Sequence, residues 1–364
     1  MTRLPPLYEL HAAAGASFTD FAGWQMPVSY GSDLAEHHAV RTAAGLFDIS
    51  HMAEIRVDGP DAAAFLDYAL AGKLSAIANC QAKYSLLLNE QGGIIDDLVV
   101  YRGGSANSYL VVANAGNRAP VVEALHERAQ GFKVAVSDES DQVSLIAVQG
   151  PASRGIVEQV TGIDLSDLKY YWGIESTYEG RPFFVARTGY TGEDGFELYV
   201  GNYNASQLWK RLLEAGAGVG LIPAGLASRD TLRLEAGMPL YGHELGVDTF
   251  PVQAGLGRVV ALAKEGDFVG RSAIEEGPAS TARKLVGLVT EGKRAGRAGY
   301  PVFDGDTEVG IITSGALSPT LGYPIAMAYV DPDSAASENL TIDVRGTRIP
   351  ATVTTLPFYK RAAK

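Results

Sequence analysis

The sequence contains two segments of the same design, and this repeat limits the folds that the chain can adopt. Residues 54–60 read as a strand that ends in Gly59-Pro60, and a helical stretch follows over 61–70. Residues 144–151 and 152–160 repeat the order of strand, Gly-Pro and helix. Proline is tolerated in the first turn of a helix, where no backbone N–H is needed. The repeat predicts two similar α/β units in the first three quarters of the chain, and a chance match is the alternative.

The last quarter of the chain has a different pattern. Short alternating runs are joined by turn signals such as Asp304-Gly305 and Arg345-Gly346, and no long helical pattern interrupts them. This arrangement predicts an all-β module, either a small barrel or a sandwich. The runs are residues 284–290, 308–314, 325–330, 340–344 and 348–355. Because 364 residues exceed one ordinary core, we expect two or three domains in total.

Composition excludes several classes of function. With 46% hydrophobic and 20% charged residues, the chain is typical of a globular protein. A net charge of -12 opposes binding to nucleic acid or to an anionic membrane. The single cysteine, Cys80, rules out an internal disulfide and fits a reducing compartment. The amino terminus lacks an apolar signal region, so we expect a cytoplasmic protein or a mature form without its leader.

Three helical patterns carry charged residues. Residues 33–44 contain His37-His38, which we interpret as surface or capping histidines because no second ligand pair has metal-site spacing; no metal is expected. Residues 204–215 read as an amphipathic helix. On the helix predicted over 223–236, Arg229 and Arg233 share one face, which serves either as a solvated ionic surface or as a ligand contact.

The stretch Gly92–Arg102 places two carboxylates in a run that otherwise reads as a buried strand. Buried acidic side chains are costly unless hydrogen bonds or cations meet them. Side chains alternate along a strand, so Asp97 shares a face with Val99 and Tyr101 while Asp96 points the opposite way. One aspartate can therefore enter a pocket while the other serves the fold; the alternative is that both stabilise the glycine turn.

Neighbouring strands predict what surrounds these acids. The runs 83–89, 93–102 and 108–114 form a meander, which brings Asp97 within reach of Tyr84 or Asn114. A second hairpin over 182–200 carries Glu197 between Phe196 and Leu198, where a hydrophobic residue is expected.

Several stretches together resemble the aminomethyltransferase, or T-protein, of the glycine cleavage system. The order and spacing of these stretches are more specific than any single stretch. Together they cover the chain almost from end to end. They are Asp20–Trp24, Gly45–Met52, Gly92–Tyr101, Gln149–Pro151, Arg187–Leu198, Ala227–Asp230, Arg233–Ala236, Thr313–Gly315 and Ser318-Pro319.

The resemblance implies an α+β fold, a three-domain cloverleaf around tetrahydrofolate. Two interleaved α/β folate-binding domains would occupy residues 1–278, roughly 1–52 with 143–230 and 53–142 with 231–278. The carboxy-terminal β-barrel would occupy 279–364. The implied reaction takes the aminomethyl group from the lipoyl arm of an H-protein and gives 5,10-methylenetetrahydrofolate, ammonia and dihydrolipoyl H-protein.

The resemblance also implies roles for particular residues. Asp97 matches the catalytic carboxylate, and Glu197 matches the carboxylate that binds the pterin ring. Lys360 stands where relatives often have arginine, so either Lys360 or Arg361 reaches the substrate. The other implied cofactor-binding residues are Met52, Tyr84, Asn114, Tyr190 and Arg229.

Two other functions fit a chain of this type. One is a tetrahydrofolate-dependent demethylase that acts on another small donor. The other is a non-catalytic folate-binding accessory protein for iron-sulfur clusters. Relatives of the second kind carry a cysteine in the glycine-tyrosine loop, which spans residues 189–195 in this chain, whereas the cysteine of this chain is Cys80.

Overall fold

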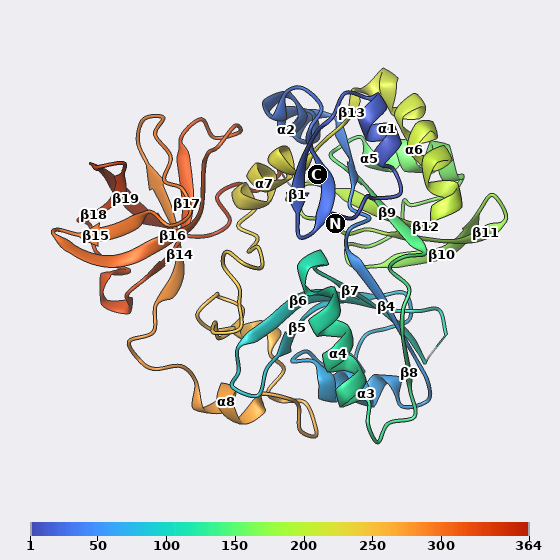
Figure 1. Ribbon diagram of the computed structural model, residues 1–364, viewed down its shortest axis with the longest axis horizontal. Coiled ribbons are helices and arrows are strands. Elements are labelled where there is room, and N and C mark those ends of the chain that lie inside the picture. Colours follow the sequence, from blue (N-terminus) through green and yellow to red (C-terminus); the bar gives the residue numbers. More distant parts are fainter. Residues whose placement is uncertain (1, 106, 363–364) are drawn as a thin grey trace.

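The computed structural model describes residues 2–105 and 107–362 and has three parts (Figure 1). Two of them are sheets covered by helices, stacked one above the other, and the third is a barrel at one side. This α+β architecture with a separate barrel confirms the predicted fold class. Within residues 2–105 and 107–362, no helix is long and apolar enough to cross a lipid bilayer.

The first sheet has six strands in the order β10-β11-β12-β9-β3-β13. Their bounds are β3 Ala44–Asp48, β9 Val143–Gln149, β10 Gly173–Tyr178, β11 Arg181–Ala186, β12 Gly195–Gly201 and β13 Leu221–Pro223. Helix α6, Asn202–Gly216, packs on this sheet through Ala205, Leu208 and Leu212, whose spacing forms one apolar stripe. The other helices of this part are α1 Tyr8–Ala13, α2 Asp33–Thr42, α5 Ser153–Thr161 and α7 Leu226–Glu235.

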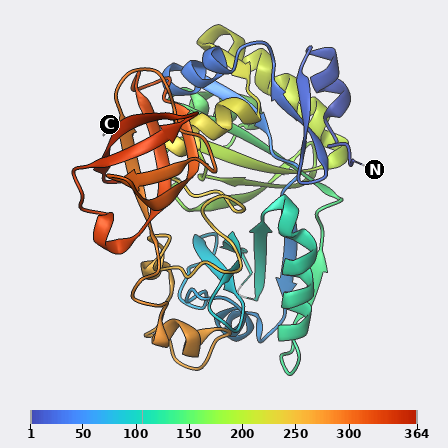
Figure 2. The same cartoon turned by 60° about the vertical axis from the view of Figure 1, so that its left-hand side comes forward.

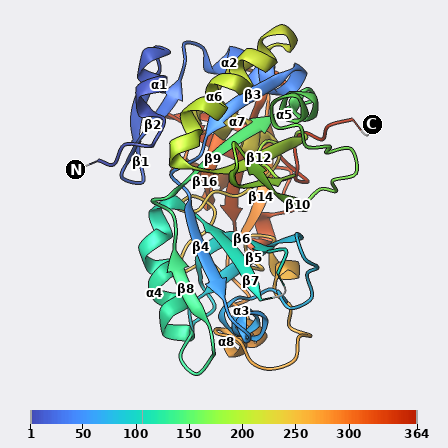
Figure 3. The ribbon, with the colours of Figure 1, turned by 90° about the vertical axis from the view of Figure 1, so that its right-hand side faces the viewer.

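The second sheet has five strands in the order β5-β6-β7-β4-β8. Their bounds are β4 Ala53–Asp58, β5 Ala82–Leu88, β6 Ile94–Arg102, β7 Ser108–Ala113 and β8 Ala135–Asp138. Helices α3, Ala62–Ala69, and α4, Arg118–Arg128, cover one face, where Phe65 and Leu125 pack against Ile55 and Val100. The opposite face is turned toward the six-stranded sheet (Figure 3).

The predicted repeat is confirmed, with one copy in each sheet. The first copy is β4 and α3, and the second is β9 and α5. Each strand leaves its sheet through a Gly-Pro pair. Gly150 has a φ of 127°, and a Cβ atom there would lie 2.6 Å from the carbonyl oxygen of Ala43, so the close approach requires glycine.

The carboxy-terminal module is a closed six-stranded barrel in the order β14-β17-β16-β15-β18-β19. The strands are β14 Lys284–Thr290, β15 Pro301–Asp304, β16 Thr307–Leu317, β17 Pro324–Val330, β18 Leu340–Val344 and β19 Thr347–Thr354. The sequence pattern predicted every strand except β15. The remaining elements are β1 Ser17–Phe21, β2 Trp24–Ser29, α8 Arg271–Glu276 and the short helices η1 Ala115–Asn117, η2 Ala217–Val219, η3 Gly257–Val259 and η4 Pro332–Ser334.

A buried polar network joins the barrel to α7, beside which it lies (Figure 2). Glu235 accepts hydrogen bonds from the Ser318 hydroxyl at 2.5 Å and from the Thr320 backbone N–H at 3.0 Å. The ring of His37 lies 3.2 Å from the same carboxylate and is fully buried. The prediction of a surface or capping role is therefore wrong for His37, because it faces α7 and the barrel.

Two other sequence interpretations need correction. The helical pattern covers residues 33–44, but helix α2 ends at Thr42 and residue 44 already lies in β3. Arg233 is 1% exposed and pairs with Glu244 at 3.1 Å, so the face of α7 that carries it is not a solvated ionic surface.

Candidate active site

A cavity of about 680 Å³ lies between the two sheets, beside α7. Its walls come from β5, β6, β12, α7 and the segments that follow β3, β7 and α7. Seven of the nine predicted site residues line it: Met52, Tyr84, Asp97, Asn114, Tyr190, Glu197 and Arg229. A ligand in this cavity therefore contacts both sheets at once.

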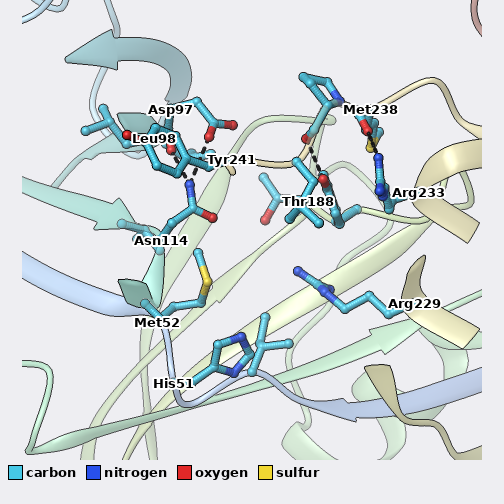
Figure 4. Close-up of a pocket in the computed structure, with 18 of the residues that line it drawn as sticks. His51, Met52, Asp97, Leu98, Asn114, Thr188, Arg229, Arg233, Met238 and Tyr241 are labelled. Atoms are coloured by element: carbon cyan, nitrogen blue, oxygen red, sulfur yellow. Dashed lines mark hydrogen bonds between the residues drawn. The ribbon is translucent and has the colours of Figure 1, made fainter. Parts of the chain in front are cut away.

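Asp97 enters the cavity from β6, on the same strand face as Val99 and Tyr101. The Tyr84 hydroxyl donates to its Oδ2 at 2.9 Å, and the Asn114 amide donates to its Oδ1 at 2.9 Å. Figure 4 shows Asn114 pointing at this carboxylate. Burial raises the pKa of Asp97, and the two hydrogen bonds lower it. Burial is the larger effect, so the pKa of Asp97 lies above its usual value, and the two donors offset part of that rise by favouring the ionised carboxylate.

Asp96 points away from the cavity and is fully buried. It accepts hydrogen bonds from the Asn114 backbone N–H at 2.9 Å, from the Asn114 amide at 2.9 Å and from the Asn117 amide at 2.6 Å. Burial and the neighbouring Asp97 raise the pKa of Asp96 to about 7. Asp96 thus fixes Asn114, and Asn114 in turn holds Asp97.

Glu197 lines the cavity from the other sheet, on β12. Its Oε2 accepts a hydrogen bond from the Thr188 hydroxyl at 2.5 Å, and the Tyr101 hydroxyl lies at 3.5 Å. Burial raises the pKa of Glu197, whereas Thr188 and the nearby Arg229 lower it. Because the protein donors among the described residues converge on Oε2, Oε1 is available to a ligand.

Arg229 on α7 brings a cation to the cavity. Its guanidinium lies 4.9 Å from the ring centroid of Tyr190, whose hydroxyl donates to the carbonyl of Pro239. Nη1 of Arg229 is buried and has no hydrogen-bond partner among residues 2–105 and 107–362. A buried donor without a partner is costly, so this nitrogen is suited to an acceptor on a ligand.

His51 is a cavity residue that the sequence reasoning did not single out, although the quoted stretch Gly45–Met52 contains it. It lies beside Met52 and opposite Arg229 (Figure 4). Burial and the charge of Arg229 lower the pKa of His51 to about 4, so the ring is neutral at pH 7. Its Nδ1 is buried and, within the described part of the chain, makes no hydrogen bond. The sequence signal that could have identified His51 is its position directly before Met52, which the resemblance already implied as a binding residue.

Lys360 and Arg361 do not line the cavity in the part of the chain that the structure describes. Arg361 lies 3.6 Å from Asp194, a carboxylate that also binds Arg187. The preceding Tyr359 donates its hydroxyl to Glu193 at 2.8 Å and fixes the tail beside the glycine-tyrosine loop. A role for Lys360 or Arg361 in substrate binding remains a prediction.

Comparisons with known proteins match this chain over nearly its full length. Residues 7–264 match the family described as GCVT N-terminal domain, and residues 283–360 match the glycine cleavage T-protein C-terminal barrel domain. The aminomethyltransferase of Cutibacterium acnes is 58% identical, over 99% of both chains. The aminomethyltransferase of Streptomyces avermitilis is 56% identical, over 97% of this chain and 96% of that one.

A solved structure agrees with these matches. The crystal structure of glycine cleavage system aminomethyltransferase T from Bartonella henselae superimposes with a TM-score of 0.91. That protein is 38% identical, and the superposition covers 99% of each chain. Because the matches include both α/β parts and the barrel, the chain belongs to the glycine cleavage T-protein family of aminomethyltransferases.

Proposed function

We propose that the cavity binds tetrahydrofolate with its pterin ring at Glu197, and that Asp97 stabilises the one-carbon unit delivered by the lipoyl arm of an H-protein. Aminomethyltransferases of this family use tetrahydrofolate as a co-substrate. The observation that carries the proposal is a pair of carboxylates, one on each sheet, that line one cavity. Among the ion pairs of the described residues, neither carboxylate has a cationic partner within 4.0 Å.

The chemistry of the donor gives Asp97 its role. When ammonia leaves an S-aminomethyl group, the C–N bond breaks and positive charge develops on the remaining carbon. A carboxylate that is already fixed by Tyr84 and Asn114 stabilises this charge without reorganising during the reaction. Asp97 is also placed to orient the attacking amine or to accept its proton.

The opposite wall offers groups that match the pterin ring. Adjacent N–H donors on the ring can bond to a carboxylate as a pair, and Oε1 of Glu197 has no described protein donor. Nη1 of Arg229 supplies an unpartnered donor, while the neutral ring of His51 supplies a polar atom of its own. The fit rests on polar atoms of the cavity wall for which the described residues supply no hydrogen-bond partner.

The test is turnover of the Asp97→Asn variant. Its amide keeps the size of the side chain but removes the negative charge. We expect folate affinity close to that of the wild type and a loss of turnover of roughly 10²–10³, as for a preorganised electrostatic partner. Ammonia release from aminomethylated H-protein and tetrahydrofolate gives the rate.

Tyr84→Phe is the matched control for this test. It removes one hydrogen bond to Asp97 but keeps the charge, so its turnover should fall less than that of Asp97→Asn. Wild-type turnover in Asp97→Asn would remove this residue from the mechanism.

A further inference from the structure

A second cavity, of about 620 Å³, lies between the same two sheets on the other side of an aromatic wall. The wall consists of Tyr101, Phe184 and Tyr199, whose ring centroids lie 5.3 to 5.8 Å apart. Tyr101 and Tyr199 line both cavities. The second cavity opens between β4 and β6 of one sheet and β10 to β12 of the other, which face each other in Figure 3.

Glu54 lines this second cavity from β4. Alternation sends Ile55 and Val57 into the core beneath α3 and α4, and leaves Glu54 and Arg56 on the face toward the other sheet. Glu54 is 1% exposed, and neither of its carboxylate oxygens has a hydrogen-bond partner among residues 2–105 and 107–362. A buried acid without a partner costs free energy.

Two nearby cations do not relieve this cost because other acids hold them, and a third, Arg102, donates to the carbonyl of Ile77 at 2.8 Å. Arg118 binds Asp138 at 2.7 Å and Asp141 at 2.8 Å. Arg56 binds Glu139 at 3.1 Å. Burial raises the pKa of Glu54 well above its usual range; Arg118 opposes the increase, while the three acids add to it. Burial therefore favours the protonated form of Glu54.

We infer that this second cavity binds a small ammonium-type cation, with Glu54 as the counter-charge and the rings of Tyr101, Phe184 and Tyr199 as an aromatic wall. An ammonium ion has N–H donors for both unpartnered oxygens. Aromatic faces attract such a cation, and do so more strongly when water is excluded. An alkali cation has no N–H donors, so it cannot form hydrogen bonds to these two oxygens.

Ammonium itself is the occupant that the reaction supplies, and this step rests on the proposed function. Ammonia released in the first cavity is separated from Glu54 by the wall that contains Tyr101 and Tyr199. On reaching protonated Glu54, ammonia takes the carboxyl proton: the O–H bond breaks, an N–H bond forms, and an ammonium carboxylate pair remains. No other reactant is needed.

The experiment measures the melting temperature of the full-length protein in ammonium, sodium, potassium and tetramethylammonium chloride at equal ionic strength. A ligand that binds the native state raises the melting temperature with concentration. We expect ammonium to raise it above the value in each of the other salts. In Glu54→Gln the apparent dissociation constant for ammonium should increase at least tenfold.

Glu175→Gln is the matched control, because Glu175 lines the same cavity, is exposed and belongs to no described ion pair. The glutamine can still accept the hydrogen bond from the Gly104 backbone N–H, so this variant should keep the ammonium response. Glu54→Met serves as a second variant if Glu54→Gln does not fold. Equal responses to ammonium and potassium, or an unchanged response in Glu54→Gln and Glu54→Met, would overturn the inference. Ammonia release with H-protein is measured separately, so failure here is distinguishable from failure of the proposed function.

Discussion

Asn114 connects the two aspartates of β6, and replacing it with alanine tests whether Asp97 acts as an ionised group. The amide nitrogen lies 2.9 Å from Oδ1 of Asp96, 2.9 Å from Oδ1 of Asp97 and 3.0 Å from the Asp97 carbonyl. Two amide protons thus serve three acceptors. Asn114→Ala removes them all but keeps the backbone N–H that binds Asp96 at 2.9 Å.

The size of the effect follows from the bond that Asp97 loses. A hydrogen bond to a charged group contributes about 1.5–3 kcal/mol. One pKa unit corresponds to about 1.4 kcal/mol, so the pKa of Asp97 should rise by about one to two units. The lost bond stabilises the ionised form, and removing it therefore moves protonation to higher pH. If the reaction needs the ionised form, the acid limb of the pH–rate profile moves up by the same amount.

The assay is single-turnover ammonia release from saturating aminomethylated H-protein and tetrahydrofolate across the acid limb. The control is Asn117→Ala, since Asn117 bonds Asp96 at 2.6 Å and makes no described hydrogen bond to Asp97. That variant should leave the acid limb in place or move it slightly to lower pH. An unmoved limb in Asn114→Ala, with the fold intact, would refute an ionised Asp97 as the acting group.

Two further predictions concern other carboxylates. Glu197→Gln should weaken tetrahydrofolate binding by roughly 10- to 100-fold, the equivalent of about 1.5–3 kcal/mol for a charged hydrogen-bond acceptor, and should slow the bound complex less; unchanged affinity by titration calorimetry would remove Glu197 from the pterin site. Burial alone would raise the pKa of Glu235, but His37, Ser318 and Arg41 outweigh it and lower the pKa from 4.5 to about 2. Its contribution to stability is therefore present above pH 4.5 and is lost as the pH falls toward 2, by about 3 kcal/mol. Glu235→Gln should flatten this part of the pH dependence of the unfolding free energy; a steep wild-type-like slope in the variant would contradict it.

Local pattern was enough to predict the strands that carry the site. Alternation along β6 assigned Asp97 to one face and Asp96 to the other, and the structure confirms this because the two side chains have different partners. The meander placed Tyr84 and Asn114 next to Asp97 for the same reason. These contacts lie within one sheet, where strand order and period two decide which side chains meet.

Contacts between distant segments were not predictable in this way. His37 is paired with Glu235 and Thr320, and nothing in its own helix indicates that the barrel will cover it. β15 is only four residues long, too short for its alternation to be read. The partners of Lys360 and Arg361 depend on where the tail crosses the glycine-tyrosine loop, and this is a property of the assembled protein.

Each of the two sheets supplies one of the two carboxylates of the site. Asp97 is held by donors from its own sheet, Tyr84 on β5 and Asn114 after β7. Glu197 on β12 is held by Thr188 from its own hairpin, with Tyr101 of the other sheet at the longer distance of 3.5 Å. Each carboxylate is thus fixed mainly within one sheet, and the distance between them depends on how the sheets pack. A substitution in the core between the sheets should therefore disturb the alignment of pterin and one-carbon unit, even while each carboxylate keeps its own hydrogen bonds.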